Sequence, residues 1–266
     1  MHVTNQELHR NFATMPALQT GSDSNRAVLA VIRPQTALWI ALLALLAYSA
    51  NAQRASGLSA DLPDRRTLAV QNKVDDLFDA GKFDRAFFIY RNELVPLGDK
   101  YAQYMVGYML LTGLGAGEDH SAAYAWYRLA AERDTPEFVA VRNRLQRSLI
   151  DDEIQRANAM YAELRREYCD LAVLLASIKK NQRELQPRTG SRLKNTSSPM
   201  TVIETRGTGV TSTGSGYYGR INRRLLARVQ LLLETGQFPE LGSDPEQIDL
   251  DDLERLVKEK VAAFPD

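Results

Sequence analysis

The sequence is poor in the residues that most often carry metal and proton-transfer chemistry. Its 266 residues include one cysteine, Cys169, and three histidines, two of which lie within the first ten residues. A single cysteine excludes an intramolecular disulfide framework and a zinc site built from clustered cysteines. The scarcity of histidine argues against histidine-based catalysis. We therefore nominate no metal-binding residue.

The chain also lacks an excess of charge of either sign. It has 33 Lys and Arg residues and 33 Asp and Glu residues, so its formal net charge is zero, and 44% of its residues are hydrophobic. This is the composition of an ordinary globular protein. It excludes a polybasic nucleic-acid-binding protein, an acidic tail and a wholly disordered chain.

The prominent apolar run near the start of the chain is short. Residues 37–48 (ALWIALLALLAY) carry no charge, but a helix needs about 20 apolar residues to cross a membrane. Ala50 and Ala52 follow with the A-x-A spacing of a signal-peptide cleavage site. The pattern predicts a signal peptide with an extended n-region over residues 1–52 and a periplasmic mature protein. An uncleaved inner-membrane anchor and a buried core helix are the alternatives.

Composition and periodicity divide the rest of the chain into five segments. These are a flexible leader (53–66), a repeat region (67–135), a long helical segment (136–185), a linker or loop (186–219) and C-terminal helices (220–266). The linker is rich in Gly, Ser and Thr, with one short β-like run at residues 200–205 (MTVIET). Asp249 is positioned to cap the last helix.

The repeat region contains an internal repetition. Residues 84–91 (DRAFFIYR) recur as residues 121–128 (SAAYAWYR), and each copy follows a break that contains glycine. A helix-turn-helix unit with a period of this size is the building block of α-solenoids. The sequence therefore predicts an all-α fold, a short solenoid of helix-turn-helix repeats.

The second copy belongs to a longer pattern of small, acidic and aromatic residues with defined spacing: Ala102, Gly107, Gly113, Gly115, Asp119, Ala123, Trp126, Tyr127, Ala130 and Ala131. This pattern resembles the Sel1-like repeat of exported bacterial proteins, a relative of the tetratricopeptide repeat. The resemblance covers residues 102–134 well and about residues 67–101 loosely. It implies a protein-binding module and no enzymatic activity.

The physical chemistry of the pattern supports two antiparallel helices. Small residues such as Gly107 and Ala123 let the helices approach closely, and Gly113 and Gly115 supply the backbone freedom to reverse the chain. The Asp119 carboxylate can accept hydrogen bonds from the free N–H groups that open the second helix. Aromatic residues then fill the space between neighbouring units.

The helical segment after the repeats carries a heptad pattern on Ile154, Ala157, Tyr161, Leu164, Tyr168, Leu171, Leu175 and Ile178. Such a seam fits either a dimerising coiled coil or a helix that packs back on the repeats. Further apolar residues widen the seam, which favours the second interpretation. Ser148, three residues before Asp151, can cap the start of this helix. Cys169 falls outside the seam, which predicts a partly covered thiol rather than a cross-link or a nucleophile.

Two motifs suggest chemistry but lack the context that it needs. Residues 214–219 (GSGYYG) match the G-x-G-x-x-G pattern of dinucleotide-binding folds, yet no second βα unit follows, so we interpret them as a flexible loop. His120 lies between Asp119 and Ser121, but catalytic triads assemble from distant segments, so we interpret it as part of a capping turn. We nominate no catalytic or cofactor-binding residue.

Charge is spread unevenly along the neutral chain. Residues 142–194 contain twelve Lys or Arg against seven Asp or Glu. This surplus either is neutralised internally or forms a positive surface for an acidic partner or an anionic envelope polymer.

One helix face offers candidate partner-binding residues, which are Tyr101, Gln103, Tyr104 and Tyr108. The tyrosines share a face, whereas Ala102, Met105 and Met109 occupy another that suits a packed core. Tyrosine is suited to binding because it combines broad apolar area with a polar tip. The alternative is that the tyrosines cover a neighbouring helix.

The sequence thus predicts an exported adaptor that binds a protein partner in the cell envelope. The expected protein is a monomer or weak dimer, with no nucleic-acid partner, no cofactor and no stable membrane insertion after cleavage. The alternatives are an envelope enzyme or polymer-binding protein with its site in residues 186–266, and a membrane-anchored scaffold that keeps its N-terminal helix.

Overall fold

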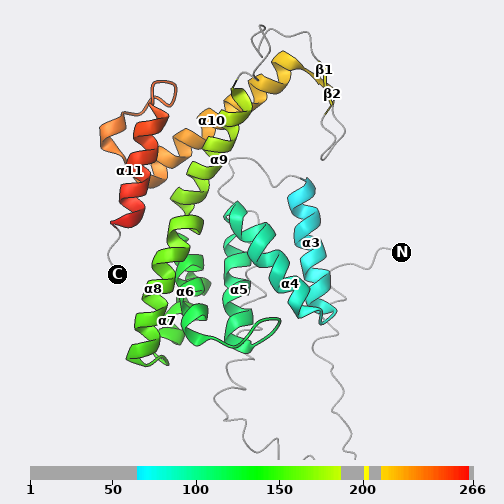
Figure 1. The fold of residues 1–266 in the computed structure, drawn as a ribbon, viewed down its shortest axis with the longest axis vertical. Helices are drawn as coiled ribbons and strands as arrows, with labels where there is room; N and C mark the ends of the chain where they lie inside the picture. The colour runs from blue at the N-terminus through cyan, green and yellow to red at the C-terminus, as the bar shows by residue number, and fades with distance from the viewer. Residues whose placement is uncertain (1–64, 187–200, 204–210, 264–266) are drawn as a thin grey trace, which may run out of the picture. The chain divides into compact units, whose positions relative to one another are not determined.

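The computed structural model describes residues 65–186, 201–203 and 211–263. In this part of the chain the fold is all-α apart from one small hairpin (Figure 1). The elements in chain order are α3 (Arg65–Asp79), α4 (Phe83–Ile89), α5 (Lys100–Thr112), α6 (His120–Ala130), α7 (Pro136–Gln146), α8 (Asp151–Tyr168), α9 (Asp170–Leu185), β1 (Thr201–Ile203), β2 (Thr211–Thr213), α10 (Gly214–Gly236) and α11 (Leu250–Ala262). The predicted signal peptide, with Ala50 and Ala52, lies outside the described residues.

Helices α5 and α6 form the tightly packed centre of the repeat region. A Cβ atom added at Gly107 of α5 would lie 2.9 Å from the Tyr127 ring and 3.2 Å from the Ala123 carbonyl oxygen of α6. Real Cβ atoms do not approach other groups so closely, so only glycine allows this separation between the helices. Other motif residues are also buried here, namely Ala102, Ala123, Trp126, Tyr127, Ala130 and Ala131.

The loop between α5 and α6 reverses the chain and contacts the preceding helix. Gly113 ends α5 with a φ of 69°, in the left-handed region. Gly115 has a φ of 71°, and a Cβ atom there would lie 2.4 Å from the Phe83 carbonyl oxygen at the start of α4. The Asp119 carboxylate then accepts a 2.9 Å hydrogen bond from the Ala122 N–H group and caps α6.

Helices α7 and α8 continue the array by packing against α6. The Phe138 ring of α7 stacks on Tyr104 of α5, with ring centroids 5.2 Å apart. The Tyr168 ring at the end of α8 stacks on Trp126 of α6, with centroids 5.9 Å apart. Aromatic side chains therefore join consecutive elements of the array, as the repeat pattern predicts.

The predicted long helix over residues 136–185 is wrong in its continuity, because the segment forms α7, α8 and α9. Cys169 separates α8 from α9 with extended backbone angles, φ −66° and ψ 160°. Its thiol accepts a hydrogen bond from the Ala172 N–H group at 3.4 Å, so it caps α9. The heptad seam is thus divided between two helices, which excludes one continuous coiled coil through it.

The start of α8 also differs from its expected form. Ser148 does not cap the helix, because its hydroxyl donates to the Leu145 carbonyl oxygen at the end of α7. Instead, the Glu153 carboxylate reaches back and accepts a 3.1 Å hydrogen bond from the Ile150 N–H group. In a capping box this bond is accompanied by one from the side chain of the N-cap residue to the backbone of the third helical residue. Ile150 has no polar side chain, so only the bond to Glu153 is present.

The described residues of the predicted linker include regular structure. The β-like run is confirmed as β1, which pairs antiparallel with β2. The expectation of a loop over residues 214–219 is wrong, because α10 begins at Gly214 and the Thr213 hydroxyl caps it through the Gly216 N–H group at 3.2 Å. The G-x-G-x-x-G residues therefore form a helical turn. The Asp249 cap on α11 is confirmed, with a 2.8 Å bond from Asp251 N–H.

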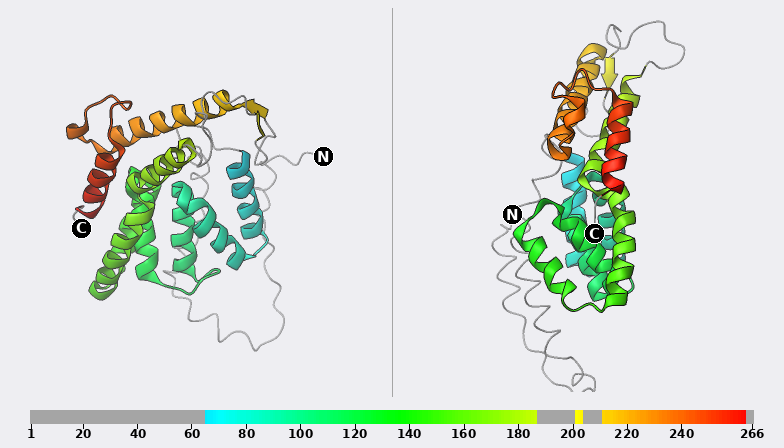
Figure 2. Two further views of the ribbon diagram at one scale, coloured as in Figure 1. Left: turned by 45° about the horizontal axis from the view of Figure 1, so that its top comes forward. Right: turned by 90° about the vertical axis from the view of Figure 1, so that its left-hand side faces the viewer.

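Helices α10 and α11 pack on the second half of the helical array. Helix α10 crosses and packs against α9, and α11 contacts both α9 and α8 (Figure 2). Their inward faces are apolar and buried, with Ile221, Val229 and Leu232 from α10 and Leu253, Val257 and Val261 from α11. Within the described ranges, no helix is both long enough and apolar enough to cross a membrane.

Candidate functional site

The candidate binding residues of α5 do not all face solvent. Gln103 and Tyr104 are buried, with 0% and 2% of their surface exposed, whereas Tyr101 and Tyr108 are half-buried. The predicted free stripe is therefore wrong at Gln103 and Tyr104. The reason is tertiary, since α7 and the α8–α9 junction cover the side of α5 on which these two residues lie.

Tyr104 is part of the aromatic core. Its ring lies 5.3 Å from the Tyr127 ring and 5.2 Å from the Phe138 ring, centroid to centroid. Burial raises the pKa of the Tyr104 hydroxyl well above its usual range. Such a residue contributes to stability through its ring contacts.

A smaller aromatic surface remains at the edge of this core. Tyr108 lies 6.3 Å from the Phe78 ring of α3, and Tyr101 lies 6.4 Å from the Tyr90 ring, centroid to centroid. Phe78, Tyr101 and Tyr108 are each half-buried, and we call them the aromatic face. It keeps part of each ring accessible on a rigid helical support, which is the arrangement of an interface anchor.

Acidic residues of α3 lie next to the aromatic face. The Tyr90 hydroxyl donates a 3.1 Å hydrogen bond to the Asp75 carboxylate. Partial burial, together with the charges of Asp75 and Asp76, raises the pKa of Asp79. Three carboxylates therefore lie close together in the last part of α3, beside Phe78.

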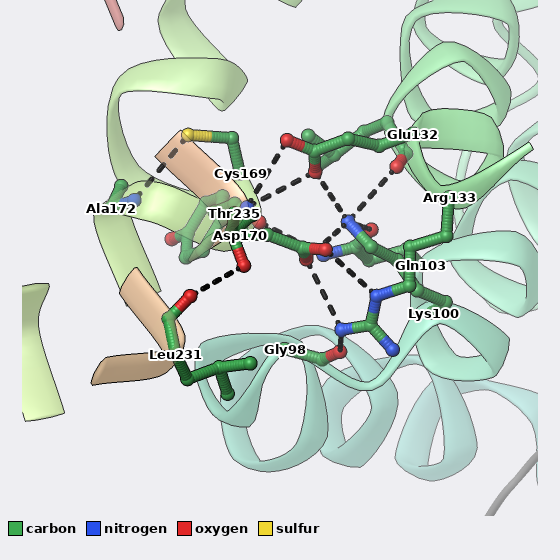
Figure 3. A network of polar contacts seen from close by, with 12 residues as sticks. Gly98, Lys100, Gln103, Glu132, Arg133, Cys169, Asp170, Ala172, Leu231 and Thr235 are labelled. Carbon is green, nitrogen blue, oxygen red and sulfur yellow. Dashed lines mark hydrogen bonds and ion pairs between the residues drawn. The ribbon is translucent and has the colours of Figure 1, made fainter. Parts of the chain in front are cut away.

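A charged network lies beneath the first turn of α5 (Figure 3). The Lys100 ammonium contacts the Glu132 carboxylate at 2.6 Å and the Asp170 carboxylate at 3.0 Å. It also donates to the Gln103 side-chain oxygen and to the Leu129 carbonyl oxygen, each at 3.1 Å. Lys100 and Asp170 are 7% and 5% exposed, so these charges are paired inside the protein.

The network fixes the α8–α9 junction against the repeat. The Arg133 guanidinium donates to both carboxylate oxygens of Asp170, at 2.7 and 3.1 Å. Glu132 accepts from the Asp170 N–H group, and the Gln103 amide donates to the Tyr168 carbonyl oxygen at 3.1 Å. Two side chains of α5 and two of the turn that follows α6 thus bind Tyr168 and Asp170, the residues on either side of Cys169.

Electrostatics explains why the buried acid of this network stays charged. Burial on its own raises the pKa of Asp170, but Lys100 and Arg133 outweigh it and hold this pKa below its usual value. All the charges are matched within the network, so it offers no free group to a substrate. We assign it a structural role.

Cys169 belongs to the same junction and is more covered than predicted. It is 1% exposed, and burial raises the pKa of its thiol to about 11. The thiol is therefore protonated at neutral pH and inaccessible, which excludes a nucleophile and a cross-link in the folded state. Local sequence carries no signal for this burial, because the groups around the thiol include Glu132 and Lys100, which lie 37 and 69 positions earlier in the chain.

His120 lies in the turn that opens α6. Its Nε2 atom is 2.9 Å from a carboxylate oxygen of Glu118, and both side chains are exposed. The Ser121 hydroxyl is buried elsewhere in the helix pair. Among the residues that the structure describes, no group of three or more His, Cys, Asp or Glu side chains is placed to hold a metal ion.

Comparison with known proteins gives one match. The model of the Sel1 repeat family matches residues 100–134. No curated protein and no solved structure matches the chain. The matched residues begin with α5, include the glycine-containing loop that contacts α4, and end just after α6. The chain therefore contains a Sel1 repeat, and this repeat is the close-packed pair of α5 and α6.

Proposed function

We propose that this protein is an exported adaptor that binds another protein in the cell envelope through its helical repeat region. The observation that carries the proposal is the Sel1 repeat at residues 100–134, because Sel1 repeats generally mediate protein–protein interactions. The proposal of export rests on the sequence of residues 37–52 alone.

The aromatic face is the part of the repeat region that best fits a partner. Phe78, Tyr101 and Tyr108 present partly exposed rings, and the neighbouring acids favour a partner with basic residues beside an apolar contact. The rings lie on α3 and α5, which α4 and the loop at Gly115 hold together. A partner would therefore meet a surface that needs little rearrangement on binding.

Site-specific photo-cross-linking in living cells tests this surface. A photoreactive phenylalanine derivative replaces Tyr101 or Tyr108, and the matched control places it at Asn222, an exposed residue of α10. We expect a discrete cross-linked protein from both α5 positions and none from Asn222. Cross-links of equal yield from all three positions, or from Asn222 alone, would contradict the assignment.

The intact mass of the purified protein tests export. Cleavage after Ala52 predicts a chain that begins at Gln53. A mass that still includes residues 37–52 would reject cleavage and favour the membrane-anchored scaffold.

A further inference from the structure

A groove lies between α9 and α11, outside the residues matched by the Sel1 repeat model. Its volume is about 460 Å³. Apolar side chains of the two helices line it, namely Ala172, Leu175, Ala176, Val257, Val261 and Ala262. Leu175, Val257 and Val261 are 9% exposed or less, so the floor of the groove is part of the protein core. We call this feature the α9–α11 groove.

The charged lining of the groove carries more positive than negative charge. Arg166, Lys179 and Lys258 line it together with one acid, Glu254. The Lys179 ammonium lies 2.7 Å from the Glu254 carboxylate, and the Lys258 ammonium lies 2.6 Å from it. One carboxylate neutralises only one of the two ammonium groups. Arg166 adds a further positive charge, so the lining carries a surplus of two.

This surplus persists at neutral pH and is accessible. Hydrogen bonds from Lys179 and Lys258 lower the pKa of Glu254 to about 2, so its carboxylate stays ionised and its pairing is constant. The side chains of Arg166 and Lys258 are 65% and 69% exposed. Arg166 makes a loose contact with Glu163 at 3.9 Å, and exposed pairs of this kind are weak.

The shape and charge of the groove select among classes of ligand. A nucleic acid needs many phosphate contacts, which a surplus of two charges does not supply. A membrane surface needs an apolar face that projects into the lipid, whereas Leu175, Val257 and Val261 lie below the charged rim. A peptide fits both features, because it can place one apolar side chain in the groove and adjacent carboxylates on the rim.

We propose that the α9–α11 groove binds an acidic peptide segment of a partner protein, with a large apolar side chain on the floor and carboxylates paired with Arg166 and Lys258. This is a second binding surface, separate from the aromatic face and independent of the proposed function of the repeat. Acids of α3 lie beside the aromatic face, whereas basic residues predominate in the lining of the groove, so the two surfaces favour different partners.

Selection from a random peptide library displayed on phage, against the immobilised full-length chain, provides the probe. The enriched peptides are then synthesised with a fluorescent label, and their Kd values are measured by anisotropy. The charge variant is Arg166→Gln/Lys258→Gln, which leaves the mutually neutral Lys179–Glu254 pair in place. Its matched control is Lys180→Gln/Arg183→Gln, which removes two exposed charges of α9 outside the groove. Ala176→Phe fills the groove without changing charge.

We expect the enriched peptides to combine Asp or Glu residues with a large apolar residue. Their Kd should rise about tenfold in the charge variant and with Ala176→Phe, and stay unchanged in the matched control. Enrichment of neutral or basic peptides, no enrichment, or equal affinity for all variants would overturn the proposal. Binding of phosphatidylglycerol vesicles that is lost in the charge variant would assign the groove to a membrane surface instead. Cross-linking at Tyr101 and Tyr108 is unaffected by any of these outcomes.

Discussion

At the scale of single residues, Gly107 sets the distance between the two helices of the repeat. The Tyr127 ring and the Ala123 carbonyl oxygen occupy the space that any side chain at position 107 would need. Gly117, in the loop, has nothing within 4 Å of an added Cβ atom. A side chain at position 107 would therefore clash with α6, whereas a side chain at position 117 would not disturb the packing.

Gly107→Leu should lower the free energy of unfolding by about 1–3 kcal/mol or more, because it inserts a large side chain into a close helix contact. Thermal unfolding followed by circular dichroism measures the effect. Gly117→Ala is the control and should melt like the wild type. Equal melting of the two variants would mean that the helices do not pack as closely as the structure shows.

Tyr104 shows what periodicity along one helix does and does not predict. The 3.6-residue period correctly groups Tyr101, Tyr104 and Tyr108 on one side of α5. It cannot say which of them a distant element covers, and Phe138 of α7 covers Tyr104. The sequence left open whether the tyrosines bind a partner or cover a neighbouring helix. Tyr101 and Tyr108 are half-buried, so each ring packs on a neighbour and also remains partly accessible.

At the scale of elements, the α8–α9 junction depends on ion pairs rather than on a helix-breaking residue. No Pro or Gly occurs between Asp151 and Leu185. The chain leaves the helical conformation at Cys169, where Glu132 and Arg133 bind the backbone and side chain of Asp170. The direction of α9 therefore depends on residues of another helix pair.

Asp170→Asn should lower the free energy of unfolding by about 3–5 kcal/mol at neutral pH, because it leaves the buried Lys100 and the half-buried Arg133 without their shared carboxylate. The folded-state pKa of Asp170 lies below its usual value of 3.8, so the charged form stabilises the fold above that pH. The stabilisation is lost as the pH falls through the lower, folded-state value. Chemical unfolding at a series of pH values measures the difference from wild type, which should shrink in acid.

Asp252→Asn is the control for this series, since Asp252 forms an exposed pair with Arg255. Its effect should be about 0–1 kcal/mol. If Asp170→Asn lowered the free energy of unfolding by no more than Asp252→Asn does, or by an amount that did not change with pH, the network would contribute little to the stability of the junction.

Elements with local signals were predicted best. The Asp249 cap, the run that forms β1 and the glycine-rich end of α5 are all encoded within a few residues. The start of α10 was missed because glycine disfavours helices, and the Thr213 cap was not recognised. The break at Cys169 was missed because its causes lie more than thirty residues away.

At the scale of the whole molecule, α11 joins the C-terminal part to the helices that follow the repeat. The Arg165 guanidinium of α8 donates a 2.6 Å hydrogen bond to the Val261 carbonyl oxygen. Lys179 of α9 pairs with Glu254. Leu253 is completely buried among these contacts. Residues that are distant in sequence therefore share one packed region.

Leu253→Ala should lower the free energy of unfolding by about 2–5 kcal/mol, because it leaves a cavity at a fully buried position. Calorimetry of the full chain should show one transition at a lower temperature, because α11 packs on both α8 and α9. Glu259→Ala, an exposed change on the same helix, should alter stability by about 0.5 kcal/mol or less. A second transition that keeps the wild-type temperature would show that the repeat unfolds independently.

The burial of Cys169 has a consequence for the life of the chain before it folds. In the unfolded polypeptide the thiol is open to oxidants and to other thiols, with its ordinary acidity. Folding encloses it at the α8–α9 junction, where it is 1% exposed and its pKa is about 11. Oxidative damage and intermolecular disulfides are thus restricted to molecules that have not matured. Reactivity of this thiol toward a labelling reagent therefore reports the fraction of molecules in which the α8–α9 junction is not folded.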